Sequence, residues 1–175
     1  MKRALFIVDA ELDFMPDGSL PVENGQEIVV YINGLLERDV YDYIFFSKDW
    51  HKKDHCSFKE NGGEWPTHCV QGTEGAKIHP EILVPLEFAS KTYQILKGMD
   101  SDKEQYSAVI NSELYPKAEY DVVGLATDVC VKATALDLRK LGNSVVVLLD
   151  GCRGVSAKST REAIDEMVEA GIVVA

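Results

Sequence analysis

Cys130 lies where the sequence predicts a sharp change from a strand to a helix. A β-branched and aromatic run of strand length, residues 120–125, precedes it, and apolar residues then recur at helical steps of three and four. Thr127 or Asp128 is positioned to cap this helix, which places Cys130 in its opening turn. The helix dipole and the unpaired N–H groups there favour a thiolate, the nucleophilic form of cysteine. The alternative is a small buried hydrophobic residue, a common fate of cysteine inside a protein.

Three further polar residues are predicted to lie at the same edge of the protein as Cys130. Asp9, Asp49 and Lys97 each come at or directly after the end of a predicted strand. The carboxyl ends of parallel strands meet at one edge of a sheet, where the ligand crevice of such folds is found. A carboxylate there can take the proton of a thiol, and an ammonium group can stabilise the thiolate. Taken alone, an aspartate or lysine after a strand is more often a capping or solvated residue, so the prediction of a catalytic site depends on all four residues together.

A second polar group follows in a long segment that has neither helix nor strand periodicity. Its candidate metal ligands are Asp49, His51, His55 and His68. One carboxylate with two or three imidazoles suits a borderline divalent ion and leaves coordination positions open for water or substrate. Cys56 and Cys69 each follow a histidine directly, so a closed structural zinc site with thiolate ligands is the alternative. Two aromatic residues flank the polar groups and are placed to enclose a flat ring, namely Phe14 and Trp65.

The elements that must position these residues alternate between strand and helix. Strands are predicted at residues 5–8, 43–47, within 88–96, and at 120–125, 144–149 and 172–174. Helices are predicted at about 26–38, 128–141 and 157–170. The strands are nearly continuous apolar runs, which is typical of parallel sheets buried on both faces. We therefore expect the α/β class, with a three-layer, doubly wound and mostly parallel six-stranded sheet that has helices on both faces.

Length and composition favour one globular domain spanning residues 1–175, with 46% hydrophobic and 27% charged residues. The net charge of -11 disfavours nucleic acid and anionic membranes as partners. No stretch reaches the roughly 18 apolar residues that a membrane span needs, and the N-terminal apolar run is too short for a signal peptide. We therefore expect a cytoplasmic protein without a membrane partner. Assembly into a homo-oligomer stays open.

Six segments of the chain resemble the nicotinamidase branch of the isochorismatase-like cysteine hydrolase family. They are residues 9–14, 49–58, 65–69, 97–98, 106–108 and 124–131. No single segment is decisive, but their order and joint presence are specific and extend over nearly the whole chain. The segments that contain Asp49, His51 and His68 separate the nicotinamidases from family members that lack a metal.

The resemblance implies hydrolysis of nicotinamide to nicotinate and ammonia through a thioester, with pyrazinamide as a second amide. Cys130 would be the nucleophile, Asp9 the proton-transfer group and Lys97 the third member of a triad. A cis peptide bond between Leu125 and Ala126 would help to form an oxyanion hole from the N–H groups of Ala126 and Cys130.

The resemblance also implies a single divalent metal ion. Its ligands would be Asp49, His51 and His68, with His55 as a further ligand, and zinc is expected first, with iron and manganese as alternatives. Phe14 and Trp65 would then enclose the pyridine ring of nicotinamide. The chain departs from the family at Glu11, where glutamine is usual. An extra carboxylate beside Asp9 is expected to raise the pKa of Asp9 or to shift the substrate preference.

Three other functions are consistent with parts of this pattern. A metal-independent relative acting on another small amide or an enol ether would use the cysteine but not the histidines. A non-catalytic protein that binds a metal or ligand could retain the same scaffold. A redox-sensing thiol protein would need a resolving cysteine, and none lies near Cys130 in the sequence.

Overall fold

A six-stranded sheet organises the structure, a computed structural model that describes residues 1–175. Its strand order is β3-β2-β1-β4-β5-β6, and every neighbouring pair is parallel. The strands are β1 (Arg3–Val8), β2 (Tyr43–Asp49), β3 (Thr92–Lys97), β4 (Glu119–Leu125), β5 (Ser144–Arg153) and β6 (Val173–Val174). The predicted α/β class with six strands is therefore confirmed, and the sheet is entirely rather than mostly parallel.

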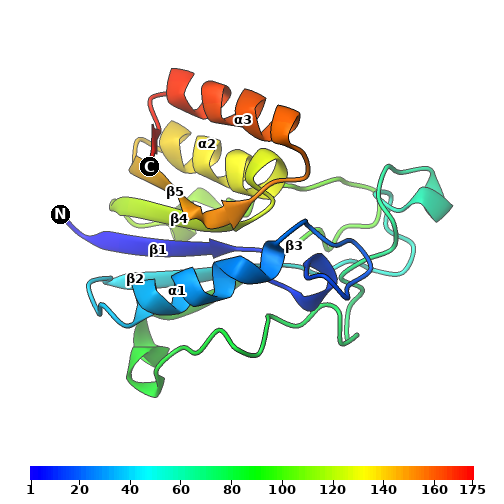
Figure 1. The fold of residues 1–175 in the computed structure, drawn as a ribbon, viewed down its shortest axis with the longest axis horizontal. Helices are drawn as coiled ribbons and strands as arrows, with labels where there is room; N and C mark the ends of the chain where they lie inside the picture. Colours follow the sequence, from blue (N-terminus) through cyan, green and yellow to red (C-terminus); the bar gives the residue numbers. More distant parts are fainter.

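Three helices cover the sheet, namely α1 (Ile28–Leu36), α2 (Lys132–Lys140) and α3 (Ala157–Glu169). The connection from β1 through α1 to β2 runs along the sheet in one direction, whereas β4–α2–β5 and β5–α3–β6 run in the other. Because such crossovers are right-handed, α1 lies on one face and the α2–α3 pair lies on the opposite face. In Figure 1 strands β1 and β4 separate α1 from that pair. None of the helices is long and apolar enough to cross a membrane.

The core is built mainly from the central strands. Residues Ala4 to Val8 of β1 are fully buried, and the large buried side chains around them include Phe45 of β2 and Tyr120 of β4. Strands covered by helices on both faces must be apolar at successive positions, which explains why they lack polar alternation. A rigid, buried sheet of this kind fixes the positions of the residues at its carboxyl edge.

Some element boundaries differ from the predicted ones. β3 begins at Thr92, because the chain from Leu86 to Lys91 forms a 3-10 helix before it. β5 extends to Arg153, so that Asp150 lies inside the strand and not at its end. The pairing of β5 with β4 shifts register between Val122 and Gly124. This shift takes up the extra residues of β5, and the two strands stay paired as far as Leu125 and Arg153.

The order of the strands reverses between β1 and β4. From β1 the chain proceeds to β2 and β3 on one side, and it then returns to add β4 on the other side. The long segment between β2 and β3 has little regular structure and is held by isolated bridges, His51 with Val70 and Phe58 with Trp65. This segment passes over the carboxyl edge of the sheet at the reversal, where parallel folds bind their ligands.

Candidate active site

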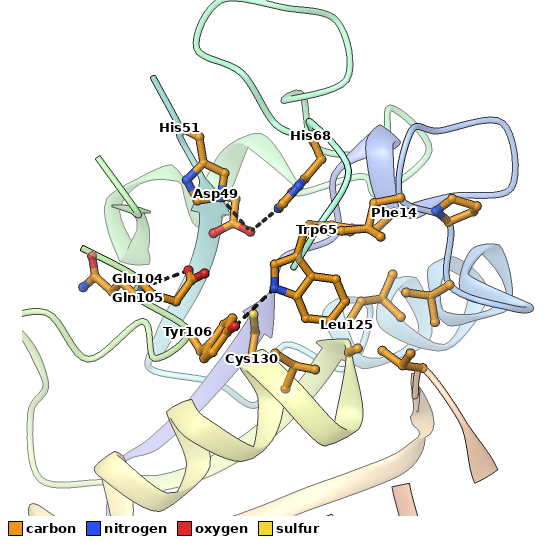
Figure 2. Close-up of a pocket in the computed structure, with 16 residues that line it drawn as sticks. Phe14, Asp49, His51, Trp65, His68, Glu104, Gln105, Tyr106, Leu125 and Cys130 are labelled. Carbon is orange, nitrogen blue, oxygen red and sulfur yellow. Dashed lines mark hydrogen bonds and ion pairs between the residues drawn. The ribbon is translucent and has the colours of Figure 1, made fainter. Parts of the chain in front are cut away.

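The carboxyl edge brings together the four polar residues that were predicted to meet there. Asp49 and Lys97 are the last residues of β2 and β3 and lie opposite each other in the strand pairing. Asp9 follows β1 directly, and Cys130 lies five residues beyond the end of β4. All four side chains are buried. Figure 2 shows Asp49 and Cys130 on the wall of a single cleft.

The ammonium group of Lys97 is the centre of this cluster. Its Nζ lies 2.8 Å from Oδ2 of Asp9 and 2.5 Å from Oδ1 of Asp49. The same Nζ donates to Sγ of Cys130 at 3.4 Å. Burial would lower the pKa of Lys97, but the two carboxylates outweigh burial and raise it well above its usual value. Lys97 is therefore a permanent cation between two buried carboxylates.

Asp9 is held in one orientation by its surroundings. Its Oδ1 accepts a hydrogen bond from the Ser47 hydroxyl at 2.7 Å, and its backbone adopts a φ of +46°. A left-handed conformation is costly for a residue other than glycine, and such residues gather at functional sites. Burial raises the pKa of Asp9, and Lys97 opposes that shift. Sequence reasoning missed Ser47, although its place two residues before Asp49 puts both side chains on one face of β2.

Burial and the nearby charges act on the pKa of the Cys130 thiol. Burial raises its pKa well above the usual value, and the pull of Lys97 in the other direction does not cancel that effect. This direction favours the thiol and is opposite to the effect expected from the helix N-terminus. A base is needed to take the proton, and the Asp9 carboxylate adjoins both Lys97 and the thiol.

The turn that carries Cys130 is shaped by a close approach between β4 and β1. Gly124 has a φ of +126°, and a Cβ there would lie 1.9 Å from the carbonyl oxygen of Val8. The peptide bond between Leu125 and Ala126 is cis, as the family resemblance implied. The chain then forms a single π-helical turn from Thr127 to Val131 before α2 begins.

The predicted cap of this helix is wrong. Neither Thr127 nor Asp128 caps it, and the residue at its N-cap position is Ala126. The Asp128 carboxylate instead accepts hydrogen bonds from the Val155 amide and the Ser159 hydroxyl. Asp128 thus ties the start of α3 to the turn that holds the thiol. Val155 is itself part of the cleft wall.

Asp49, His51 and His68 form a group with the geometry of a metal site. Their nearest nitrogen and oxygen ligand atoms all lie within 4.8 Å of one another. His51 Nδ1–H donates to the Gly98 carbonyl at 2.8 Å, and His68 Nδ1–H donates to the Pro66 carbonyl at 2.7 Å. Nε2 of each ring therefore faces Oδ2 of Asp49, at 3.5 Å for His51 and 3.7 Å for His68. Backbone carbonyls that fix the tautomer in this way are typical partners of metal-binding histidines.

His55 is adjacent to this group but does not belong to it. Its ring lies 4.1 Å from that of His51, measured between centroids. Ser57 engages Nδ1 of His55, because its amide donates to that atom at 3.2 Å and its hydroxyl lies 2.7 Å away, whereas the buried Nε2 has no hydrogen-bond partner. Burial and the neighbouring His51 lower the pKa of His55, which keeps it neutral. His55 lies outside the group of Asp49, His51 and His68, and its role as a further ligand stays a prediction.

The structural zinc alternative also lacks support. Neither Cys56 nor Cys69 joins the group of Asp49, His51 and His68. Burial and nearby carboxylates raise the pKa of the Cys69 thiol well above its usual value, which disfavours the thiolate that zinc requires.

The cleft beside these groups is lined largely by apolar and aromatic side chains (Figure 2). Phe14 and Trp65, both predicted to enclose a ring, lie on its wall, and the ring centroids of Phe14 and His68 are 5.7 Å apart. Tyr106, which was not predicted as a site residue, accepts a hydrogen bond from the Trp65 indole at 3.2 Å. An apolar cleft with a few convergent polar groups at one end is the usual form of a small-molecule site.

A small α/β protein with a thiol, a carboxylate and an ammonium group at the switch point of its sheet matches a known family. The model of the isochorismatase domain matches residues 3–175. The chain belongs to the isochorismatase family.

Several characterised relatives cover almost the whole chain. It is 34% identical to the nicotinamidase of Escherichia coli, with 97% of this chain and 92% of that protein aligned. It is 36% identical to a nicotinamidase/pyrazinamidase of Mycobacterium tuberculosis, over 97% and 96% of the two chains.

Solved structures agree with these relatives. The pyrazinamidase of Pyrococcus horikoshii in complex with zinc has a TM-score of 0.90 and 34% identity, and it covers 100% of this chain and 99% of its own. PnC1 from L. infantum in complex with nicotinate has a TM-score of 0.92 and 33% identity, with 99% of this chain and 92% of that chain covered.

Proposed function

We propose that the protein hydrolyses nicotinamide to nicotinate and ammonia, and that it also accepts pyrazinamide. The observation that carries this proposal is the contact of Lys97 with Asp9, Asp49 and Cys130 at the end of an aromatic cleft. The nicotinamidases that the chain resembles over nearly its full length support the choice of substrate. The nicotinate complex of a structural neighbour supports it independently.

In the proposed reaction Asp9 takes the proton of the Cys130 thiol as the sulfur attacks the carboxamide carbon. A carbon–sulfur bond forms, and the carbon–nitrogen bond breaks as Asp9 returns the proton to the nitrogen, which leaves as ammonia. Water then attacks the thioester with Asp9 as its base. The carbon–sulfur bond breaks, nicotinate forms, and Cys130 regains a proton. Lys97 stabilises the sulfur when it carries negative charge.

The negative charge on the carbonyl oxygen needs donors during both steps. We assign this role to the backbone N–H groups of Ala126 and Cys130, which lie in the turn that carries the nucleophile. The Ala126 amide donates no hydrogen bond within the protein, which leaves it available to a substrate. Loss of one such donor commonly costs about 3 kcal/mol of transition-state stabilisation.

Asp49, His51 and His68 are the residues that would hold a divalent metal ion. Their donor set fits zinc, because two imidazole nitrogens and one carboxylate, ligand types that zinc binds, converge within 4.8 Å of one another. The zinc complex of the related pyrazinamidase supports zinc first, with iron and manganese as alternatives. When bound, the ion would supply an electrophilic anchor for the ring nitrogen. Phe14 and Trp65 would enclose the ring and direct the carboxamide toward Cys130.

The proposal is tested by ammonia release from nicotinamide with the zinc-loaded protein. Cys130→Ala should lower kcat by at least about 1000-fold, because loss of a nucleophile from a catalytic triad costs this or more. Cys56→Ser, at a partly exposed cysteine outside the cluster, is the matched control and should keep full activity. An active Cys130→Ala variant would refute the mechanism. An unmodified protein that hydrolyses other amides but not nicotinamide would refute the substrate.

A further inference from the structure

The peptide unit of Gly98 is held by side chains at both of its polar groups. Its carbonyl accepts the hydrogen bond from Nδ1 of His51 at 2.8 Å. Its amide donates to Oε1 of Gln105 at 3.0 Å. Gly98 directly follows the last residue of β3, where the chain leaves the sheet and no neighbouring strand can accept from its amide. Gln105 supplies the acceptor that the sheet no longer provides.

The position of this peptide controls the ring of His51. Gly98 has a φ of +63°, and a Cβ at this residue would lie 2.3 Å from Cε1 of His51. The imidazole therefore packs directly against the backbone of Gly98 as well as bonding to its carbonyl. A rotation of this peptide would move the only acceptor that keeps the proton of His51 on Nδ1. Nε2, which faces Asp49, can offer a lone pair to a metal ion only while the proton of the neutral ring stays on Nδ1.

Gln105 belongs to a segment that is anchored on both sides of it. Before it, the Ser101 carbonyl accepts from the Cys56 amide at 2.7 Å, and the Ser101 hydroxyl donates to Asp54 at 2.8 Å. After it, the Ala108 amide donates to the Thr134 hydroxyl of α2 at 3.0 Å. These anchors fix the backbone of Gln105, so its half-buried side chain reaches back to Gly98 from a defined position. Gln105 also lines the cleft (Figure 2).

We propose that Gln105 is a positioning residue for the metal site, acting through the Gly98 peptide on the tautomer and orientation of His51. The inference rests on the proposed function, because it takes Asp49, His51 and His68 as metal ligands. Gln105 has no hydrogen bond to Asp49, His51 or His68, but it would contribute to the affinity of that group for a divalent ion. Partners of this kind are worth about 10- to 100-fold in metal affinity.

The test compares zinc affinities by competition with a chromophoric chelator. Gln105→Met keeps the length of the side chain but removes the acceptor, and it should weaken zinc binding by about 10- to 100-fold. Gln105→Glu retains an acceptor oxygen and should bind zinc within about threefold of the unmodified protein. Gln105→Ser, which shortens the side chain, is a second variant that should bind as weakly as Gln105→Met.

Gln71→Met is the matched control. The Gln71 side chain also bonds a backbone group beside His51, donating to the Trp50 carbonyl at 2.8 Å, but it has no bond to Gly98. This variant should keep its zinc affinity. The second readout is the kinetics of Gln105→Met at saturating zinc, where kcat should recover to near that of the unmodified protein.

Equal zinc affinity in Gln105→Met and the unmodified protein would overturn the inference, as would a lowered Tm of the metal-free variant with unchanged affinity. The latter would mean that Gln105 only stabilises its loop. These results differ from a failure of the proposed function, in which the unmodified protein itself would not bind zinc or release ammonia from nicotinamide. That outcome would overturn the metal site and the inference together.

Discussion

Asp9 and Asp49 contact the buried ammonium group of Lys97, and the carboxyl group of Glu11 is buried beside them. Burial would raise the pKa of Asp49, but Lys97 and the two histidines hold it well below its usual value. Burial, with Asp9 and Asp49 nearby, raises the pKa of Glu11 well above its usual value. These effects favour the protonated form of Glu11. A protonated glutamate has the shape and acceptor of glutamine, the residue that the family usually has at this position.

Glu11→Gln should consequently keep kcat/KM within about threefold, because both side chains accept the bond that the Asp49 amide makes with Oε1 at 2.5 Å. Glu11→Ala leaves that buried amide without an acceptor and should lower the free energy of unfolding by about 1–3 kcal/mol. Steady-state kinetics and urea unfolding measure the two effects. A drop of more than tenfold in Glu11→Gln would show that the charge of Glu11 is needed.

The pH dependence of kcat/KM should report Asp9. Asp9 must be ionised to accept the thiol proton, so activity is present above its pKa and is lost as the pH falls through it. Burial raises this pKa, so the acid limb should have its midpoint above the ordinary aspartate value of 3.8. A profile that stays flat down to pH values below that midpoint would argue against Asp9 as the base.

At the scale of elements, the approach of β4 to β1 sets the place of the nucleophile. Gly124→Ala would put a methyl group against the Val8 carbonyl in a backbone conformation that alanine avoids. We expect a loss of about 3 kcal/mol or more in the free energy of unfolding, together with lower kcat, from urea denaturation and kinetics.

Gly34→Ala is the control for that substitution. Gly34 lies in α1, and a Cβ there would meet nothing within 4 Å. The variant should be more stable by up to about 1 kcal/mol, because alanine is the better helix former. Equal effects at Gly34 and Gly124 would show that the close contact between β1 and β4 has no special role.

The strands could be predicted from the sequence because buried parallel strands have a strong apolar signal, although the end of β5 was placed too early. Asp49 and Lys97 were located in this way. The π-helical turn from Thr127 to Val131 could not be predicted, since its shape depends on contacts of Asp128 with the start of α3. Side-chain partners that lie far away in sequence leave no local pattern.

At the scale of the molecule, the meeting of the site residues at one edge followed from the rule that parallel sheets bind ligands at the carboxyl ends of their strands. The rule did not indicate which residues of the long segment after β2 would join them. The segment after His51 folds through bridges such as Phe58 with Trp65, which no periodicity reveals. The position of His55 outside the group of Asp49, His51 and His68 depends on how this segment folds, which leaves no pattern in the sequence. A single domain and a cytoplasmic location stay predictions from composition.

Metal removal should affect the stability of the whole molecule as well as its activity. Binding of zinc to the folded chain alone adds about 2.7 kcal/mol when free zinc is about 100 times Kd. For a chain of this length that corresponds to a rise in Tm of roughly 5–10 °C. Calorimetry after treatment with a chelator, and after addition of zinc, measures this shift. His51→Ala should show a much smaller rise, and an equal rise would place the metal elsewhere.

Lys97 belongs at once to the cluster that contains the thiol and to the group that contains the histidines. A substitution in the thiol cluster and one in the histidine group are therefore expected to have effects that depend on each other. Removing the Asp49 carboxylate leaves Asp9 as the single carboxylate partner of Lys97. The pKa of Asp9, the proposed base, would then change although Asp9 itself is unaltered. A double-mutant cycle between the two groups should depart from additivity by about 0.5–3 kcal/mol. A lineage that discards the metal ligands thus has to rebalance the charges around its nucleophile as well.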